Sequence, residues 1–243
     1  MGFTITGGMT FSGGLSFIAP PGIVTDNLVL YYDPSNTSSY PGSGNTVYDL
    51  SGNGLNGTLT NVTYTSPSFV FNWPSTNAYI TVADNPLLEP GAGSYSLEIW
   101  YRYNAQQGNQ YLLSKWANTG FSGLTYAATR TFGDATYSWW GSGSTGEQNT
   151  QMGAVSETWY QTVYVLSRSP SNLYAYSNGN LIRTNAHTLG SINNTSEPLY
   201  IGCRFGNTDF YSGRIGIIRL YNTALSTAQI QQNWNVTRSK YGL

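Results

Sequence analysis

Charged side chains are scarce in this chain. Ten Lys and Arg and eleven Asp and Glu make up 9% of its 243 residues, whereas charged residues form roughly 25% of an ordinary domain. The net charge of −1 offers no basic surface for nucleic acid. A disordered chain combines low hydrophobicity with high net charge, but here 40% of the residues are hydrophobic and 15% aromatic. This composition, with 28 Gly, predicts an all-β protein with many tight turns.

Cysteine and histidine occur once each, as Cys203 and His187. One cysteine excludes an intramolecular disulfide, and its apolar neighbours predict a buried position in a strand. One histidine excludes a His-rich zinc site; it follows a predicted hairpin, where we expect an exposed strand end. No apolar run approaches the roughly 18 residues of a membrane helix, and the first residues lack the basic start of a signal peptide. We therefore expect no membrane partner, and synthesis in a cytoplasm.

The first 22 residues carry no charge and nearly repeat in steps of six. Ile5, Phe11 and Phe17 recur at an even spacing that places all three on one side of a strand. Proteins use charged side chains to stop strand edges from pairing, so their absence favours an arm that attaches to another subunit or a partner by strand addition. The alternatives are a first edge strand of the same sheet or a flexible tail. We divide the chain into an attachment or oligomerisation arm, residues 1–22, and a domain, residues 23–243.

The rest of the chain predicts strand after strand, because alternating or continuous apolar runs are separated by turn clusters. The clearest strands are residues 28–33, 69–73, 78–83, 95–103, 110–115, 158–167, 173–178, 198–202 and 213–222. In residues 95–103 the side chains of Tyr95, Leu97, Ile99, Tyr101 and Tyr103 share one face, and Glu98 and Trp100 share the other. The regular spacing of turns predicts a sandwich of two antiparallel sheets.

Two local signals are strong. Asn178-Gly179 between apolar strands predicts a tight hairpin turn. Residues 225–235 predict the one good helix, since Ser226 and Gln229 have the spacing of a capping box. Ile230 and Trp234 lie four residues apart and so share a face of this helix.

Five stretches, in order along the chain, resemble the laminin-G-like domains of the concanavalin-A-like jelly rolls. They are DNLVLYYDPSNTSSYPGSGNTVYDLSGNGLNGTLTN (26–61), AYITVADNPLL (78–88), YSLEIWYR (95–102), LYAYSNGNLI (173–182) and GRIGIIRLYNTALSTAQIQQNWN (213–235). The resemblance implies an all-β, concanavalin-A-like jelly-roll sandwich with one short C-terminal helix. It says less about function, because this sandwich carries lectins, hydrolases, receptors and structural modules. The PGSG and YDLSGNG segments and the RSKYGL ending resemble domains of bacteriophage and other viral particle proteins.

Catalytic and metal-binding signals are weak. The glucanases of this fold place carboxylates at alternate positions of one strand, but Glu98 stands alone in its strand, so we expect no enzyme. Asp49 begins a turn that includes Asn53, where its carboxylate would accept backbone N–H bonds. The alternative interpretation is a calcium site, because carboxylate and amide oxygens are suitable ligands. No spaced set of acids accompanies the pair, and we expect no cofactor.

Aromatic side chains near predicted loops are candidates for glycan binding, since sugar faces stack on exposed rings with amides and hydroxyls at the rim. Trp139 and Trp140 are adjacent, so both cannot face the core of a flat strand. The candidates are Tyr137, Trp139, Trp140 and Trp116.

Two functions from different classes follow. A surface poor in Lys and Glu and rich in aromatics resembles an interface, which predicts a homo-oligomer, possibly a trimer. The first hypothesis is a non-enzymatic virion structural protein, made in the host cytoplasm and placed on the virion surface. It would be a capsid decoration or tail or surface fibre component, attached through its arm to the major capsid or tail protein. The second is a carbohydrate-binding adhesin that recognises a host-surface glycan.

Overall fold

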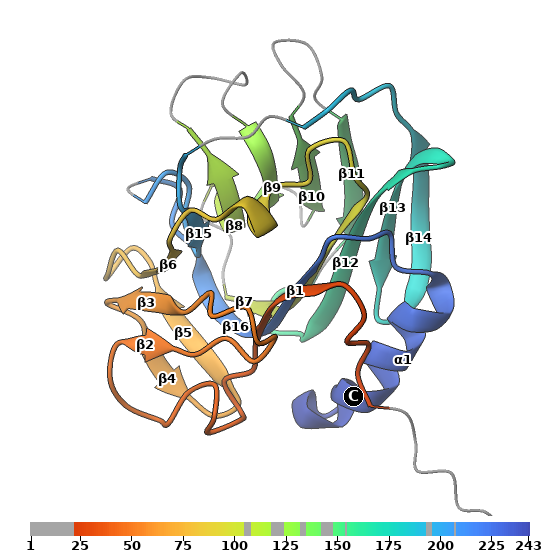
Figure 1. Ribbon diagram of the computed structural model, residues 1–243. Coiled ribbons are helices and arrows are strands. Elements are labelled where there is room, and N and C mark those ends of the chain that lie inside the picture. Colours follow the sequence, from red (N-terminus) through yellow and green to blue (C-terminus); the bar gives the residue numbers. More distant parts are fainter. Residues whose placement is uncertain are drawn as a thin grey trace, which may run out of the picture.

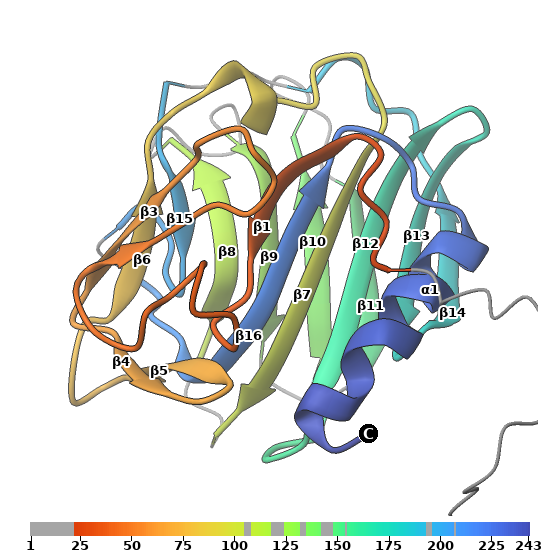
Figure 2. The same ribbon diagram turned by 60° about the horizontal axis from the view of Figure 1, so that its bottom comes forward.

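Two antiparallel sheets packed face to face make up the computed structural model (Figures 1 and 2). It describes residues 22–243 except 105–107, 118–123, 132–134, 142–147, 154, 193–195 and 207. Sheet 1 has the strand order β14-β13-β12-β7-β16-β5-β4, and β1 pairs with β16; sheet 2 has the order β11-β10-β9-β8-β15-β6-β3-β2. The predicted all-β sandwich is confirmed.

The strands that the sequence predicted are all present, with ends that differ from the prediction by at most two residues. Sheet 1 contains β1 (Leu28–Tyr32), β4 (Thr63–Thr65), β5 (Ser68–Asn72), β7 (Tyr95–Tyr103), β12 (Tyr160–Arg168), β13 (Ser171–Ser177), β14 (Asn180–Ala186) and β16 (Ser212–Tyr221). Sheet 2 contains β2 (Thr46–Val47), β3 (Gly57–Thr60), β6 (Tyr79–Val82), β8 (Gln110–Trp116), β9 (Leu124–Thr131), β10 (Ala135–Trp140), β11 (Gln148–Gly153) and β15 (Leu199–Ile201).

The main core lies between the two sheets and is unusually rich in tyrosine. Along β7, the predicted face of Tyr95, Leu97, Ile99, Tyr101 and Tyr103 points into this core, and all five side chains are buried. Strands from both sheets contribute to the same cluster. Since apolar burial is the main favourable term in folding, this layer holds the two sheets together.

The outer face of sheet 1 is covered by the C-terminal elements. Helix α1 (Thr227–Thr237) and the short helix η2 (Arg238–Tyr241) lie across this sheet, and Figure 2 shows α1 in front of β12, β13 and β14. Ile230 packs on Val163 and Val165 of β12, and Tyr241 stacks on Trp100 of β7. The second face of β7 is therefore buried as well, which its sequence pattern did not reveal.

The start of α1 agrees with the capping signal in the sequence. The Ser226 side chain accepts a hydrogen bond from the Gln229 backbone N–H, and the Gln229 side chain accepts one from the Ser226 backbone N–H. This reciprocal capping satisfies donors that a helix otherwise leaves unpaired. The helix extends from residue 227 to residue 237, two residues later than predicted.

The hairpin between β13 and β14 turns at Asn178 and Gly179, as predicted. Both residues have positive φ, 50° and 78°, which is the conformation that a two-residue hairpin turn requires. A side chain at position 179 would also strike Trp234, since an added Cβ would lie 3.0 Å from its ring. Glycine is therefore needed here both for the turn and for the approach of α1.

Asp33, just after β1, forms an ion pair that holds the short helix η2 on the sandwich. Its buried carboxylate accepts hydrogen bonds from Lys240 of η2 and from Ser35. Burial raises the pKa of Asp33, but the bonds from Lys240 and Ser35 outweigh it and hold the pKa below its ordinary value of 3.8. The native state therefore binds this proton less readily than the unfolded chain, and the contact stabilises the fold above about pH 4.

Replacing Asp33 by asparagine is expected to lower the free energy of unfolding by about 1 kcal/mol at pH 7, because Lys240 is partly exposed and its ion pair is partly screened. The difference from the wild type should shrink as the pH falls below 4 and the wild-type carboxylate becomes protonated. Urea unfolding of both proteins between pH 3 and pH 7 measures this. A difference that stays constant over the range would contradict the assignment.

The described chain begins beside α1. The Gly22 carbonyl accepts a hydrogen bond from Gln232 (2.6 Å), and the Val24 backbone N–H donates to the Asn233 side chain (2.8 Å). The predicted arm residues Ile5, Phe11 and Phe17 lie outside the described residues.

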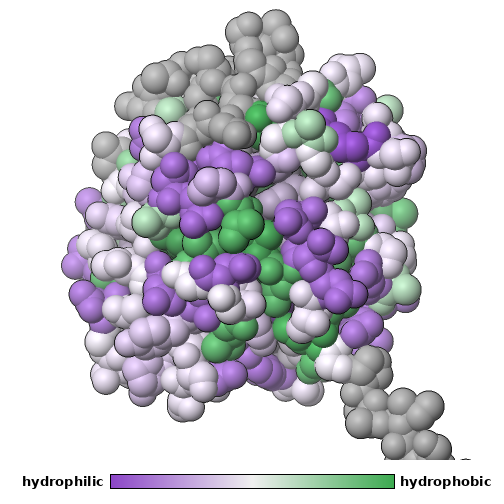
Figure 3. Space-filling model, viewed as in Figure 1, coloured by the Kyte–Doolittle hydropathy of each residue, from purple (hydrophilic) through white to green (hydrophobic). Residues whose placement is uncertain are grey.

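None of the helices in the described part is long and apolar enough to cross a membrane. On the face shown in Figure 3, apolar residues gather in a patch that polar residues surround.

Candidate functional site

The four aromatic candidates are divided between the two faces of sheet 2. Trp139 and Trp140 are neighbours in β10, so their side chains point to opposite faces. Trp140 belongs to the main core between the sheets, whereas Trp139 packs with a separate cluster on the outer face. The prediction that only one of the two faces the core is confirmed.

Two of the candidates present no ring to a ligand. Trp140 is fully buried, and its ring packs against Tyr126 in the core. Trp116 is 4% exposed because Phe205 lies against its ring at 5.5 Å. The assignment of these two tryptophans as stacking surfaces was wrong.

Tyr137 and Trp139 remain as a half-buried pair on the outer face. They stand two residues apart on β10, and their ring centroids are 6.4 Å apart. The Trp139 Nε1–H donates to the hydroxyl of Thr129 on the neighbouring strand (3.1 Å). This hydrogen bond fixes the orientation of the indole, which then presents a pre-set apolar surface beside a phenol.

A cation lies against other rings on this face. The guanidinium carbon of Arg204 is 5.3 Å from the ring centre of Tyr111, 5.6 Å from that of Trp116 and 4.7 Å from that of Phe205. Arg204 also pairs with Asp209 at 2.5 Å. Strand register places Tyr111 and Tyr137 in one row, with Thr129 of β9 between them.

We call this surface the aromatic face. It consists of Tyr111, Trp116, Tyr137, Trp139, Phe205 and Arg204. Since α1 and η2 pack on sheet 1, the aromatic face and the helices lie on opposite sides of the molecule. Of these rings, the half-buried pair of Tyr137 and Trp139 can stack on a sugar, while the Tyr137 hydroxyl and the Arg204 guanidinium can hydrogen-bond to its rim.

The turn that contains Asp49 and Asn53 has a structural role. The Asp49 carboxylate accepts hydrogen bonds from the backbone N–H groups of Tyr31 (2.9 Å), Ser51 (2.9 Å) and Leu55 (3.1 Å). The Asn53 amide donates to the carbonyl groups of β1. The predicted turn function of Asp49 is confirmed. Among the described residues, no group of three or more His, Cys, Asp or Glu side chains could hold a metal ion.

The family is shown by a sequence match over residues 74–231, more than half of the chain. The matching family model is that of the laminin G type, described as the concanavalin A-like lectin/glucanases superfamily. The chain belongs to this superfamily. As its name says, the superfamily includes both lectins and glucanases. No curated protein sequence matches the chain.

Solved structures with the same fold include binding domains of bacterial toxins. The binding domain of Paraclostridial Mosquitocidal Protein 1 matches with a TM-score of 0.68 and 17% identity, over 87% of this chain and 52% of that one. The binding domain of botulinum neurotoxin DC, in complex with SialylT, matches with a TM-score of 0.66 and 14% identity, over 87% of this chain and 52% of that one. A structure of botulinum neurotoxin type C, a toxin whose cell entry depends on interaction with two ganglioside molecules, matches with a TM-score of 0.65 and 16% identity. The match covers 87% of this chain and 51% of that one. This chain spans about half the length of these proteins, and the likeness concerns the fold.

Glu98, the acid that stands alone in its strand, is fully buried. Its Oε1 accepts hydrogen bonds from Arg219 (2.8 Å) and Gln161 (2.9 Å), and its Oε2 accepts one from Asn233 of α1 (2.7 Å). Burial opposes the charge on Arg219, but Glu98 outweighs it and raises the pKa of Arg219 above its ordinary value. Glu98 is thus a structural anchor beneath α1 and does not reach a substrate.

His187 was expected at an exposed strand end and is instead 6% exposed. Its Nδ1 accepts a hydrogen bond from the Leu189 backbone N–H (3.2 Å), so its Nε2–H donates to the Ser167 carbonyl (2.8 Å). Both ring nitrogens are therefore used within the fold, and the imidazole is not presented to a nucleophile.

Proposed function

We propose that this domain is a non-catalytic carbohydrate-binding module that recognises a glycan through the aromatic face. The observation that carries the proposal is the half-buried pair of Tyr137 and Trp139, oriented by Thr129 on the side of the sandwich opposite α1. A sugar ring has apolar C–H faces and a polar rim, so it complements aromatic rings bordered by hydrogen-bonding groups.

The composition of the aromatic face also suits a sugar better than a nucleic acid. Arg204 is compensated by Asp209, so the face does not carry the excess of positive charge that binding to phosphates requires. Tyr137 offers a hydroxyl group, while Trp139 offers apolar area. Such a combination of rigid aromatic surface and few polar groups is typical of small-ligand sites.

The comparisons support the same proposal. Two of the toxin domains with this fold are described with SialylT or with ganglioside molecules, which carry sugars. They share 14–16% identity with this chain, so they support a class of ligand and do not identify its site. Glycan binding therefore becomes the first proposal, ahead of the particle role that the sequence suggested.

A panel of immobilised neutral and sialylated glycans, probed with the full-length protein, tests the proposal. We expect retention on a defined subset of glycans that share one terminal sugar, because a small site reads one or two rings. Retention on none of the panel, at protein concentrations near 1 mM where even weak sites fill, would overturn the proposal.

Assembly through residues 1–22 is a separate prediction. The described residues, which begin at Gly22, form both sheets and the core between them. We therefore expect a chain that starts at Gly22 to unfold with a free energy within about 0.5 kcal/mol of the full-length value, as for changes away from packed sites. Sedimentation should show an oligomer for the full-length protein and a smaller species for the shortened one. A full-length protein that sediments as a monomer at high concentration would contradict the predicted oligomer.

A further inference from the structure

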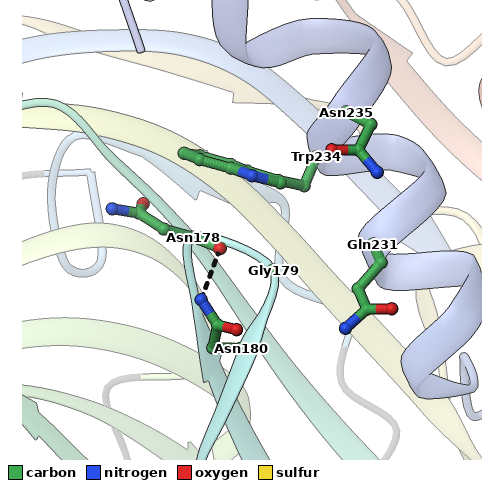
Figure 4. A pocket seen from close by; sticks show the side chains of 6 residues that line it. All are labelled: Asn178, Gly179, Asn180, Gln231, Trp234 and Asn235. Carbon is green, nitrogen blue, oxygen red and sulfur yellow. Dashed lines mark hydrogen bonds between the residues drawn. The ribbon is translucent and has the colours of Figure 1, made fainter.

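A second concave site lies on the opposite side of the sandwich from the aromatic face. The turn between β13 and β14 and one side of α1 enclose a pocket of about 210 Å³ (Figure 4). We call it the carboxamide pocket. Its lining residues are Asn178, Gly179, Asn180, Gln231, Trp234 and Asn235.

Hydrogen-bonding groups without partners face this pocket. The side chains of Gln231 and Asn235 are exposed and make no hydrogen bond to the described residues. The Asn180 Nδ2 donates to the Asn178 carbonyl at 3.0 Å, the bond drawn in Figure 4, which leaves the Asn180 Oδ1 as an acceptor. None of the lining side chains carries a charge. The pocket therefore offers donors and acceptors to a neutral ligand and no counter-charge to an ion.

The indole of Trp234 forms a rigid wall. It stacks on Trp100 with 5.2 Å between the ring centroids and an angle of 6° between the planes. Gly179 also packs against Trp234, since an added Cβ would lie 3.0 Å from the ring. Figure 4 shows the ring edge-on over the turn of Asn178 and Gly179. The orientation of the ring is thus fixed before any ligand arrives.

The buried Glu98 anchors both walls of the pocket. On one side, the Asn233 amide of α1 donates to its Oε2. On the other, the Gln161 amide donates to its Oε1, while the Gln161 Oε1 accepts from the Gly179 backbone N–H (3.1 Å) and the Gln161 backbone N–H donates to the Asn178 side chain (3.0 Å). A site held in place in this way loses little freedom on binding, which favours affinity.

We propose that the carboxamide pocket binds one uncharged monosaccharide unit. Carboxamides pair well with hydroxyl and acetamido groups because each carries both donors and an acceptor. The volume is below the roughly 300–1,000 Å³ of pockets that take drug-sized ligands, so it suits a single ring. The proposal rests on the carbohydrate-binding function but assigns to it a second site, which would let one domain bind two separate glycans on its opposite sides.

Side-chain NMR of the full-length protein tests the second site. Neutral methyl glycosides of glucose, galactose and N-acetylglucosamine are added to roughly 50 mM, because single-ring sites often have Kd values on the order of 1 mM. We expect saturable shifts of the Trp234 indole N–H with at least one glycoside, unchanged in the variant Trp139→Ala. The double variant Gln231→Ala/Asn235→Ala should weaken binding about tenfold, as expected from the loss of two neutral hydrogen bonds.

Gln232→Ala is the matched control, since Gln232 stands on the same helix and bonds to Gly22 rather than lining the pocket. It should leave the affinity within about twofold, as for other changes outside a binding site. Absence of any shift at Trp234, or shifts that the double variant does not weaken, would overturn the second site. Shifts confined to Trp139 would do so while supporting the aromatic face. Binding of a charged probe in preference to the neutral glycosides would overturn the ligand class.

Discussion

Replacing Glu98 by glutamine is expected to lower the free energy of unfolding by about 3–5 kcal/mol, because a buried ion pair that loses one partner leaves the other charge uncompensated. Arg219 and Glu98 are both fully buried. The Arg219 guanidinium lies over the ring of Tyr31 at 4.8 Å, so it cannot reach water without disturbing β1. The substitution keeps the shape of the side chain, removes its charge and replaces one acceptor oxygen by an NH2 donor, so one of the bonds from Arg219, Gln161 or Asn233 is lost as well.

Urea unfolding of the full-length protein at pH 7 measures this effect. Glu157→Gln is the matched control, since it removes the same charge from the exposed pair with Arg102, and it should cost less than about 1 kcal/mol. If Glu98→Gln costs no more than this control, the hydrogen-bond network around Glu98 does not hold α1 on sheet 1.

Replacing Trp139 by alanine is expected to weaken glycan binding about thirtyfold, or about 2 kcal/mol, the loss typical of a tryptophan at the centre of a binding site. The ring is half-buried and its Nε1–H donates to Thr129. We therefore expect the fold to survive with a loss of only about 1 kcal/mol in the free energy of unfolding.

The affinity of the full-length variant for the best glycan of the panel gives the result. Tyr48→Ala is the matched control, because Tyr48 is 46% exposed next to β2, at the other end of sheet 2 from β10. Equal affinities for wild type and Trp139→Ala would move the binding site away from the aromatic face, whatever glycan is bound.

Local signals predicted the strands and the helix well, because they depend on nearby residues. The alternation in residues 95–103, the turn at Asn178-Gly179 and the capping box of Ser226 and Gln229 are all present. The local pattern did not predict that the outer face of β7 is buried as well as its inner face. Glu98 and Trp100 become core residues only because a helix more than a hundred residues later packs over them.

The binding residues were predicted only in part. Alternation indicated that Trp139 and Trp140 face opposite ways, but which one faces the core depends on the position of the other sheet. The outcome for Trp116 depends on a bulge between Lys115 and Trp116 and on Phe205, which arrives from the segment after β15. Arg204 was not predicted as a site residue for the same reason, since its ring partners come together only through the pairing of β8 with β15.

The carboxamide pocket had a partial signal in the sequence. The Asn178-Gly179 turn was predicted, and Trp234 was placed with Ile230 on one face of the helix, whereas Gln231 and Asn235 were not singled out. The meeting of the turn and the helix depends on Gln161 and Glu98, two buried polar residues that no local pattern distinguishes from solvent-facing ones. Buried polar networks of this kind are decided by tertiary packing.

The most direct test of the central claim is a titration of the full-length protein, labelled with ¹⁵N in its tryptophan indoles, with the glycan that the panel retains. The Trp139 signal, identified by its loss in Trp139→Phe, is expected to shift with the same midpoint as binding, while the buried Trp140 signal stays in place. Saturable binding that leaves the Trp139 signal unmoved, or a panel that retains no glycan at all, would contradict the claim that this face of the sandwich binds carbohydrate.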